Sequence, residues 1–173
     1  EGRALDEARA TLVAAAEGRC SGAHFGTYDY TAACRITAAH QTMTHPACEF
    51  AKQVMQVVLA GTGVQLSDGA TNVMPVAPHR VAPGGPPLTQ EQQLKNRAAV
   101  QRAWQLHFDD VRSSLRNGFY QGWDLHPAQL PTRYAAVYSF FLEGLETASL
   151  RLRSFMEKAA QASSMKGNPL PLT

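Results

Sequence analysis

Residues 118–129 read GFYQGWDLHPAQ, and this stretch decides how the chain folds. Gly118 stands where a helix would end, and Phe119–Asp124 is a short, fairly apolar run of the kind that forms buried strands. The residues that follow, Leu125–Gln129, make a loop with polar side chains. The stretch therefore predicts a strand that presents polar groups at its carboxyl end.

Two similar segments, each a predicted strand followed by a loop, precede it in the chain. Cys20–Phe25 is a short apolar run closed by residues 26–30, which we expect to be a loop that offers a carboxylate. Val64–Ser67 is the strand of the second segment, and Asp68 with Gly69 is a turn signal at its carboxyl end. The sequence therefore predicts three short strands, each followed by a polar loop.

Helical patterns surround the predicted strands. Thr89 and Gln92 resemble a capping box, the signature of a helix start, and Gly18 stands where a helix end favours glycine. Between the second strand and the capping box, residues 74–88 contain five prolines and predict a loop. The spacing of apolar residues predicts helices over 4–17, 46–60, 89–117 and from about 132 onward.

The second of these helices, over 46–60, is apolar around much of its circumference and is predicted to be largely buried. Aromatic residues at helical spacing are predicted to belong to the core, at Trp104, Phe108, Tyr134, Tyr138 and Phe141. Helices that alternate with short apolar strands predict an α/β fold with a parallel sheet. Three strands cannot close a barrel, and 173 residues are few for a complete (β/α)8 barrel of about 250.

Composition excludes several classes of protein. Sixteen basic and fourteen acidic residues give a net charge of +2 without a Lys/Arg block, so no nucleic-acid partner is predicted. No apolar run reaches the roughly 20 residues that span a bilayer, so no membrane partner is predicted either. Cys20, Cys34 and Cys48 are too far apart for a CxxC motif, and their odd number argues against a disulfide framework. We expect three buried free cysteines in a cytoplasmic protein.

Two stretches carry a resemblance to a known family. Residues 24–33, HFGTYDYTAA, resemble the G-x-x-D-Y segment that ends the sixth strand in citrate lyase β-subunits and malyl-CoA lyases. Residues 118–129 are similar to the glycine-rich approach and I-H-P-x-Q motif of the eighth strand there, with Leu125 in place of isoleucine. Residues 66–73 lie where the seventh strand would end. The run from Gly18 to Tyr138 most resembles an uncharacterised bacterial branch of this HpcH/HpaI aldolase and citrate lyase family.

The resemblance implies the C-terminal part of a (β/α)8 barrel of the phosphoenolpyruvate/pyruvate type, with the N-terminal strands absent. The barrel domain would cover residues 1–162, followed by a flexible tail over 163–173. It further implies a carbon–carbon lyase or aldolase that acts on a 2-keto acid or an acyl-CoA hydroxy acid through an enolate. Such enzymes use Mg²⁺ (or Mn²⁺), a hard cation that prefers carboxylate oxygens and stabilises a developing enolate oxygen.

Asp29 matches the second metal carboxylate of that family, although it could instead cap the segment that follows or form a turn. The family's first metal ligand, a glutamate, and its substrate-binding arginine have no convincing match in this chain. Residues at the strand ends lie on the barrel face where active sites occur. His126 is the candidate catalytic residue there, or else it holds its loop by hydrogen bonds to the backbone. The candidate substrate-binding residues are Gly26, Thr27, Ser67, Asp68 and Gln129.

Several of these residues could instead have a purely structural role. Asp68 could be a plain Asp-Gly turn, Gly26 could only permit a tight turn, and Asp124 could be a structural acceptor for its loop. The rival hypothesis for the whole chain is a catalytically incomplete half-barrel that self-associates or needs a complementing chain. On either hypothesis we expect a homo-oligomer.

Overall fold

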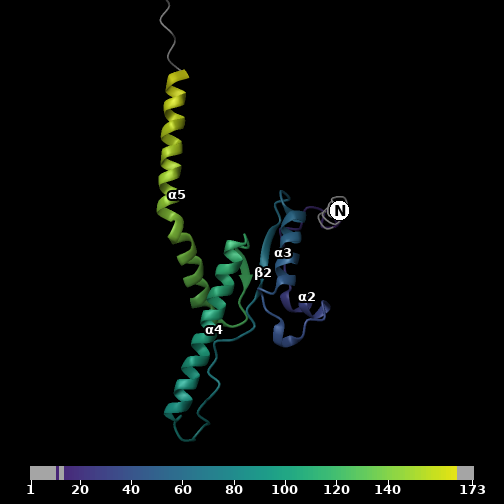
Figure 1. The fold of residues 1–173 in the computed structure, drawn as a ribbon, viewed down its shortest axis with the longest axis vertical. Coiled ribbons are helices and arrows are strands. Elements are labelled where there is room, and N and C mark those ends of the chain that lie inside the picture. The colour runs from purple at the N-terminus through teal and green to yellow at the C-terminus, as the bar shows by residue number, and fades with distance from the viewer. Residues whose placement is uncertain (1–10, 12–13, 167–173) are drawn as a thin grey trace, which may run out of the picture. The chain divides into compact units, whose positions relative to one another are not determined.

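The computed structural model describes residue 11 and residues 14–166 (Figure 1). The chain divides after Val137 into two compact units. The first unit contains the sheet and most of the helices, and the second contains the later part of the last helix. The elements in chain order are β1 (Gly22–His24), α2 (Thr27–Ala33), a 3-10 turn (Ala38–His40), α3 (Pro46–Leu59), β2 (Gln65–Ala70), α4 (Gln90–Arg116), β3 (Gln121–Trp123), a second 3-10 turn (Pro127–Gln129) and α5 (Leu130–Lys166).

The three strands form one parallel sheet in the order β1-β2-β3. His24 pairs with Ser67, and Ser67 in turn pairs with Gln121, so these three residues lie in one row across the sheet. The predicted strands, the predicted parallel sheet and the α/β class are thereby confirmed. β2 runs further than predicted, because Asp68 and Gly69 lie inside the strand and do not form the expected turn.

β2 requires glycine at position 69 for a packing reason that the Asp68-Gly69 turn signal does not indicate. A Cβ atom at position 69 would overlap the Thr27 hydroxyl of α2. The backbone of β2 therefore lies close against the start of α2, a position that only glycine permits. This close contact and the buried carboxylate of Asp68 keep residues 68 and 69 extended, although the dipeptide Asp-Gly by itself predicts a turn.

Residues 27–30 also differ from the expectation, since they form the first turn of α2 and not a loop. Thr27 and Thr31 are one helical turn apart and are both buried, and the Thr31 hydroxyl donates to the Thr27 carbonyl at 2.8 Å. Tyr28 reaches the end of β2 with its hydroxyl. The burial of Thr27 and Thr31 and the tertiary contact of Tyr28 outweigh the weak helix propensity of a segment rich in threonine and tyrosine.

α3 and α4 cover the same face of the sheet. Lys52 of α3 and Ser114 of α4 both hydrogen bond to the carboxylate of Asp68, which therefore points from β2 between the two helices. Figure 1 shows β2 flanked by these helices. His24, Gln65 and Gln121 of the strands are exposed, so the opposite face of the sheet is open to solvent in the part of the chain that the structure describes.

Helix starts and ends follow the sequence signals closely. The capping box of α4 is present, with Thr89 Oγ1 accepting from Gln92 N and Gln92 Oε1 accepting from Thr89 N. Gly118 ends α4 with a φ of 82°, which favours glycine. Of the helix predicted over 4–17, residues 4–10, 12 and 13 lie outside the described residues, and Thr11, Ala14 and Ala15 are helical. Of the predicted tail, residues 163–166 continue α5 and residues 167–173 are not described, so the domain boundary at 162 stays a prediction.

The core is smaller than predicted. Phe50 and Val57 of α3 are each 65% exposed, and Cys34 is exposed as well. Four of the five aromatic residues predicted to be core are also exposed, namely Trp104, Tyr134, Tyr138 and Phe141. The buried hydrophobic side chains lie mainly in the first unit, at Phe25, Met43, Cys48, Val58, Leu59, Ala70, Ala103, Val111, Leu115, Phe119 and Ala136. Apolar periodicity marks a face that can be buried, but whether a partner covers it depends on tertiary structure.

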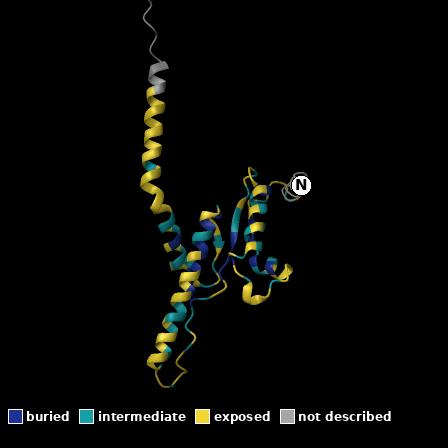
Figure 2. Ribbon diagram, viewed as in Figure 1, coloured by how far each residue is buried: buried dark blue, intermediate teal, exposed yellow. Residues whose placement is uncertain are grey.

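Figure 2 shows that the later part of α5 is exposed along its length, as is much of the first half of α4. Although α4 and α5 are long, no helix in the described residues has a stretch apolar enough to cross a membrane.

Candidate functional site

The carboxyl ends of the three strands are joined by two side chains. Tyr28 of α2 donates its hydroxyl hydrogen to Ala70 O at 2.9 Å and accepts from Asn72 N at 3.1 Å, which ties the end of β1 to the end of β2. Burial raises the pKa of Tyr28, so its phenol stays protonated and keeps donating. Gln129 makes the second link, because its side-chain amide donates to Thr71 O at 3.0 Å.

Gln129 is fully buried, and its remaining polar atom is also engaged. Its side-chain carbonyl accepts from Leu125 N at 2.8 Å and from His126 N at 3.0 Å. The predicted substrate-binding residue thus supports the loop after β3. Trp104 contributes to the same support, because its indole N–H donates to Ala128 O at 2.9 Å.

His126 begins the 3-10 turn after β3 and holds it from its N-cap position. Its Nδ1 atom accepts a hydrogen bond from Ala128 N at 3.1 Å. This is the backbone-holding role foreseen as an alternative, but it engages only one of the two ring nitrogens. Because Nδ1 accepts, a neutral imidazole carries its proton on Nε2, which can therefore donate to a ligand.

A depression of about 210 Å³ lies beside His126. Its other lining residues are Asp124, Leu125, Pro127 and Leu130. It is therefore built entirely from the loop after β3 and the start of α5.

Asp29 is exposed in the first turn of α2, directly after the carboxyl end of β1. A Cβ atom at Gly26 would lie 3.6 Å from Asp29 Oδ2, so the carboxylate lies over the glycine at the helix start. Within residue 11 and residues 14–166, no group of three or more His, Cys, Asp and Glu side chains is arranged to hold a metal ion. Asp29 is an exposed carboxylate that belongs to no such group among the described residues.

Asp68 is placed in the protein interior, with 1% of its surface exposed. Its Oδ2 atom accepts from Lys52 Nζ at 3.1 Å and from Ser114 Oγ at 2.6 Å, and its Oδ1 atom accepts from Gly69 N at 2.7 Å. Lys52 also lies 2.8 Å from Glu49. Burial alone would lower the pKa of Lys52, but these two carboxylates outweigh it and raise that pKa above its ordinary value.

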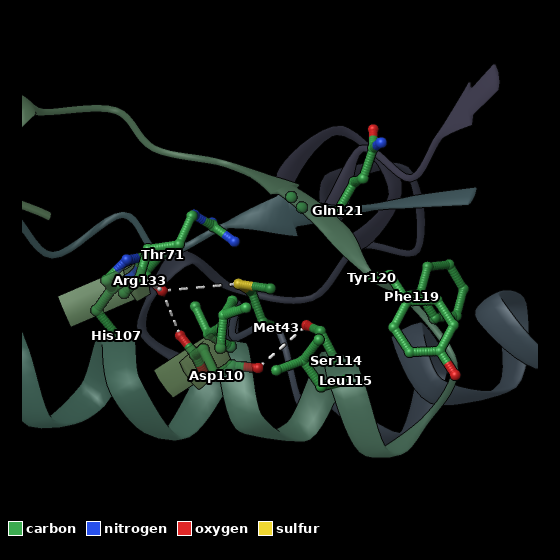
Figure 3. Close-up of a pocket in the computed structure, with 14 residues that line it drawn as sticks. Met43, Thr71, His107, Asp110, Ser114, Leu115, Phe119, Tyr120, Gln121 and Arg133 are labelled. Atoms are coloured by element: carbon green, nitrogen blue, oxygen red, sulfur yellow. Dashed lines mark hydrogen bonds between the residues drawn. The ribbon is translucent and has the colours of Figure 1, made fainter. Parts of the chain in front are cut away.

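A second buried network connects α4 to the ends of β2 and β3, and Figure 3 shows its members Thr71, His107, Asp110 and Arg133. Thr71 donates its hydroxyl hydrogen to Asp110 Oδ2 at 2.7 Å, and His107 Nδ1 lies 3.2 Å from the same hydroxyl oxygen. On its other side, His107 Nε2 lies 3.1 Å from Asp124 Oδ1, at ion-pair distance. Arg133 Nε then donates to Asp124 Oδ2 at 2.6 Å.

Burial sets the protonation of this second network. It lowers the pKa of His107, an effect that Asp124 only partly opposes, so the imidazole favours its neutral form. Burial also raises the pKa of Asp110, while the hydrogen bond from Thr71 acts in the opposite direction. The network encloses a cavity of about 10 Å³, which has room for about one water molecule and none for a substrate.

The open face of the sheet has a larger hollow of about 450 Å³. Ser67 lies here, and its hydroxyl oxygen is 3.2 Å from His24 Nδ1. The His24 ring stacks on Trp123 with ring centroids 4.4 Å apart. Gln65 and Gln121 line the same hollow, so this face of the sheet is polar and aromatic.

The predicted site residues therefore fall into three places. Gly26, Asp29 and His126 lie at the carboxyl ends of the strands, while Ser67 lies on the open sheet face. Thr27, Asp68 and Gln129 are buried.

Sequence reasoning did not identify Lys52, Asp110, Ser114 or Arg133 as members of these networks, and it found no role for His107. A usable signal was nevertheless present. His107, Asp110 and Ser114 share the face of α4 that also buries Val111 and Leu115, and polar groups on an apolar helix face must find partners.

The sequence profile of a family described as "Domain of unknown function (DUF6986)" matches residues 3–168 of the chain. No curated protein and no solved structure matches it.

Proposed function

The chain belongs to the DUF6986 family of domains of unknown function, and we propose that it forms part of a metal-dependent carbon–carbon lyase or aldolase. Its three strands would be consecutive strands of a (β/α)8 barrel. The substrate would be a 2-keto acid or an acyl-CoA hydroxy acid, and the reaction would pass through an enolate. The resemblance of residues 24–33 and 118–129 to the aldolase and citrate lyase family motivates this proposal.

The observation that supports it best is the arrangement of sheet and helices. Strand order follows chain order, and α3 and α4 cover the same face of β2. An open doubly wound sheet would instead reverse its strand order at one point and carry helices on both faces. In a barrel the face with His24, Ser67 and Gln121 would turn inward, where side chains of neighbouring strands fill the interior in layers.

Asp29 and His126 are the side chains that we assign to substrate chemistry. Both lie at the carboxyl ends of strands, the side of a barrel on which active sites are built. Asp29 fits Mg²⁺ as a single carboxylate ligand, since this ion commonly keeps several waters and takes one or two carboxylates along with substrate oxygens. When bound, the ion would act as a Lewis acid toward a developing enolate oxygen.

His126 would donate its Nε2–H to a carboxylate or carbonyl oxygen of the substrate, while Ala128 N holds Nδ1 and so fixes the ring. We assign positioning roles to Gln129 and Asp68. The first holds the His126 loop against β2, and the second joins β2 to two helices.

Calorimetric titration with Mg²⁺ or Mn²⁺, in the presence of pyruvate or oxaloacetate, tests the proposal. We expect binding by the wild-type chain and a loss of at least tenfold in affinity for Asp29→Ala, because the only assigned protein ligand is removed. Asp109→Ala is the matched control, since it removes another exposed carboxylate from α4 and should leave binding unchanged. Equal binding by all three proteins, or none by the wild type, would contradict the assignment of Asp29.

A further inference from the structure

The later part of α5 carries a seven-residue repeat that the proposed function does not use. From Tyr138 onward, apolar residues are spaced alternately by three and four positions. In heptad notation they occupy the a positions Tyr138, Leu145, Leu152 and Ala159 and the d positions Phe141, Ala148 and Phe155. An average spacing of 3.5 residues keeps one seam of a slightly supercoiled helix facing a helical partner, and three heptads are enough to indicate a coiled coil.

This seam is exposed. Among its large side chains, Leu145 is 55% exposed, Leu152 59% and Phe155 70% (Figure 2). An isolated helix is of marginal stability in water, and most helices in proteins are stabilised by packing of an apolar face. We therefore infer a coiled-coil surface, and we propose that residues 138–159 form a parallel two-stranded coiled coil with the same segment of a second copy of this chain.

The size of the seam suits that partner. Aromatic side chains bury about 150–250 Å² each when fully covered, so three aromatic and two leucine positions, each more than half exposed, contribute substantially. Summed over two copies they reach on the order of 1,000 Å², which is the area that a specific interface needs.

Charge favours the parallel orientation. The g positions carry Gly144, Arg151 and Lys158, whereas the e positions carry Leu142, Ser149 and Met156. In a parallel pair each g residue meets an e residue of the other helix, so Arg151 packs its aliphatic stem against Met156. In an antiparallel pair g residues would meet g residues and bring like charges together. The identical sequence of a second copy therefore suits the parallel arrangement.

Two exposed leucines provide a matched test of the seam. Leu152 occupies an a position and is 59% exposed, and Leu150 occupies an outward f position and is 56% exposed. Sedimentation equilibrium of the full chain should show a dimer for the wild type and for Leu150→Glu. For Leu152→Glu we expect the dimer dissociation constant to rise about 100-fold or more, since a charge replaces a buried leucine in both copies. A monomeric wild type at tens of micromolar, or equal effects of the two substitutions, would overturn the proposal.

Orientation is tested by cysteine cross-linking in a chain whose Cys20 and Cys34 are replaced by serine. Ala159→Cys places a thiol at an a position, and Ala160→Cys places it one residue further on the outer face. In a parallel dimer, mild oxidation should cross-link the first variant and not the second. In an antiparallel pair centred on residues 138–159, the two residues 159 would be about 32 Å apart along the helix, far beyond disulfide reach. A dimer that Ala159→Cys fails to cross-link would overturn the parallel arrangement.

Discussion

At the scale of single residues, the Lys52–Asp68 pair dominates the interior of the first unit. Both groups are almost fully buried, and Asp68 satisfies its oxygens with two further donors, Ser114 and Gly69. Because the folded-state pKa of Lys52 is raised, its contribution to stability is complete below its unfolded pKa and is lost only as pH rises through the higher folded value. The pair is therefore intact at neutral pH.

Lys52→Met should lower the free energy of unfolding by roughly 3–5 kcal/mol, because it leaves the carboxylate of Asp68 buried without its cation. Lys95→Met is the control, since Lys95 pairs with Glu91 on the exposed surface of α4, where such pairs contribute about 0–1 kcal/mol. Urea unfolding monitored by circular dichroism would measure both. If both variants lost a similar free energy of unfolding, the buried pair would contribute no more to stability than the exposed pair.

His107 gives the fold a dependence on acid. Its pKa is lowered in the folded chain, chiefly by burial, so the unfolded chain binds a proton more readily. The stability that neutral His107 contributes is present above its unfolded pKa of about 6.5 and is lost as pH falls through the folded value. Asp110 acts in the opposite sense, because its raised pKa favours the folded state as its carboxylate becomes protonated.

A comparison of variants isolates the histidine from Asp110. Between pH 7.5 and 5.5, we expect the wild type to lose more unfolding free energy than His107→Gln, which keeps a polar side chain but cannot titrate. Urea midpoints at the two pH values would measure the difference. If the two proteins lost the same amount, His107 would not be the acid-sensitive group.

At the scale of elements, the capping box decides where α4 begins. The Thr89 hydroxyl accepts from Gln92 N and so satisfies one of the free N–H groups of the first turn. Thr89→Ala should lower the free energy of unfolding by about 1 kcal/mol. Thr37→Ala is a suitable control, because Thr37 stands at the N-cap of a 3-10 turn and makes no side-chain cap hydrogen bond. Thermal unfolding of the two variants measures the effect, and a loss of the same size at position 37 would contradict it.

The elements also show where local signals are insufficient. Pro46 and the capping box at Thr89 mark helix starts correctly, because the interactions that they describe lie within one turn of the chain. Asp68 and Gly69 carry an equally plain local signal for a turn, yet they continue β2. Lys52 and Ser114, 16 and 46 residues away, hold the aspartate, and Thr27 occupies the space beside the glycine. No local pattern contains those contacts.

At the scale of the whole molecule, each unit presents a surface suited to further contacts. Among its described residues, the first unit leaves one face of a parallel sheet open, with His24, Ser67 and Gln121 on it, whereas parallel sheets are ordinarily covered on both faces. The second unit presents the heptad seam of α5. Barrel closure would cover the first surface, and a second copy of the chain would cover the other. These two proposals are independent, since metal binding at Asp29 and dimerisation through Leu152 have separate tests.

Some residues of the candidate site could be predicted from the sequence, and the placement of others depends on the tertiary structure. Asp29 and His126 could be found from the sequence, because polar residues that directly follow apolar strands collect at one edge of a parallel sheet. Sequence position alone could not separate Asp29, which is exposed, from Asp68, which is buried, since both stand near a strand end. Their difference depends on which helices pack beneath the sheet.

The sequence by itself determined the three strands, their parallel sheet and the starts of α3 and α4, because periodicity and capping act over a few neighbouring residues. It did not reveal α2, which is held by contacts with β2. Only the tertiary structure decided which polar groups are buried together and which apolar faces remain exposed. His107 and Asp110 of α4 both contact Thr71 after β2, and His107 also contacts Asp124 after β3. These contacts arise only when β2 and β3 lie side by side. Burial and pairing of this kind depend on residues far apart in the chain, which periodicity cannot bring together.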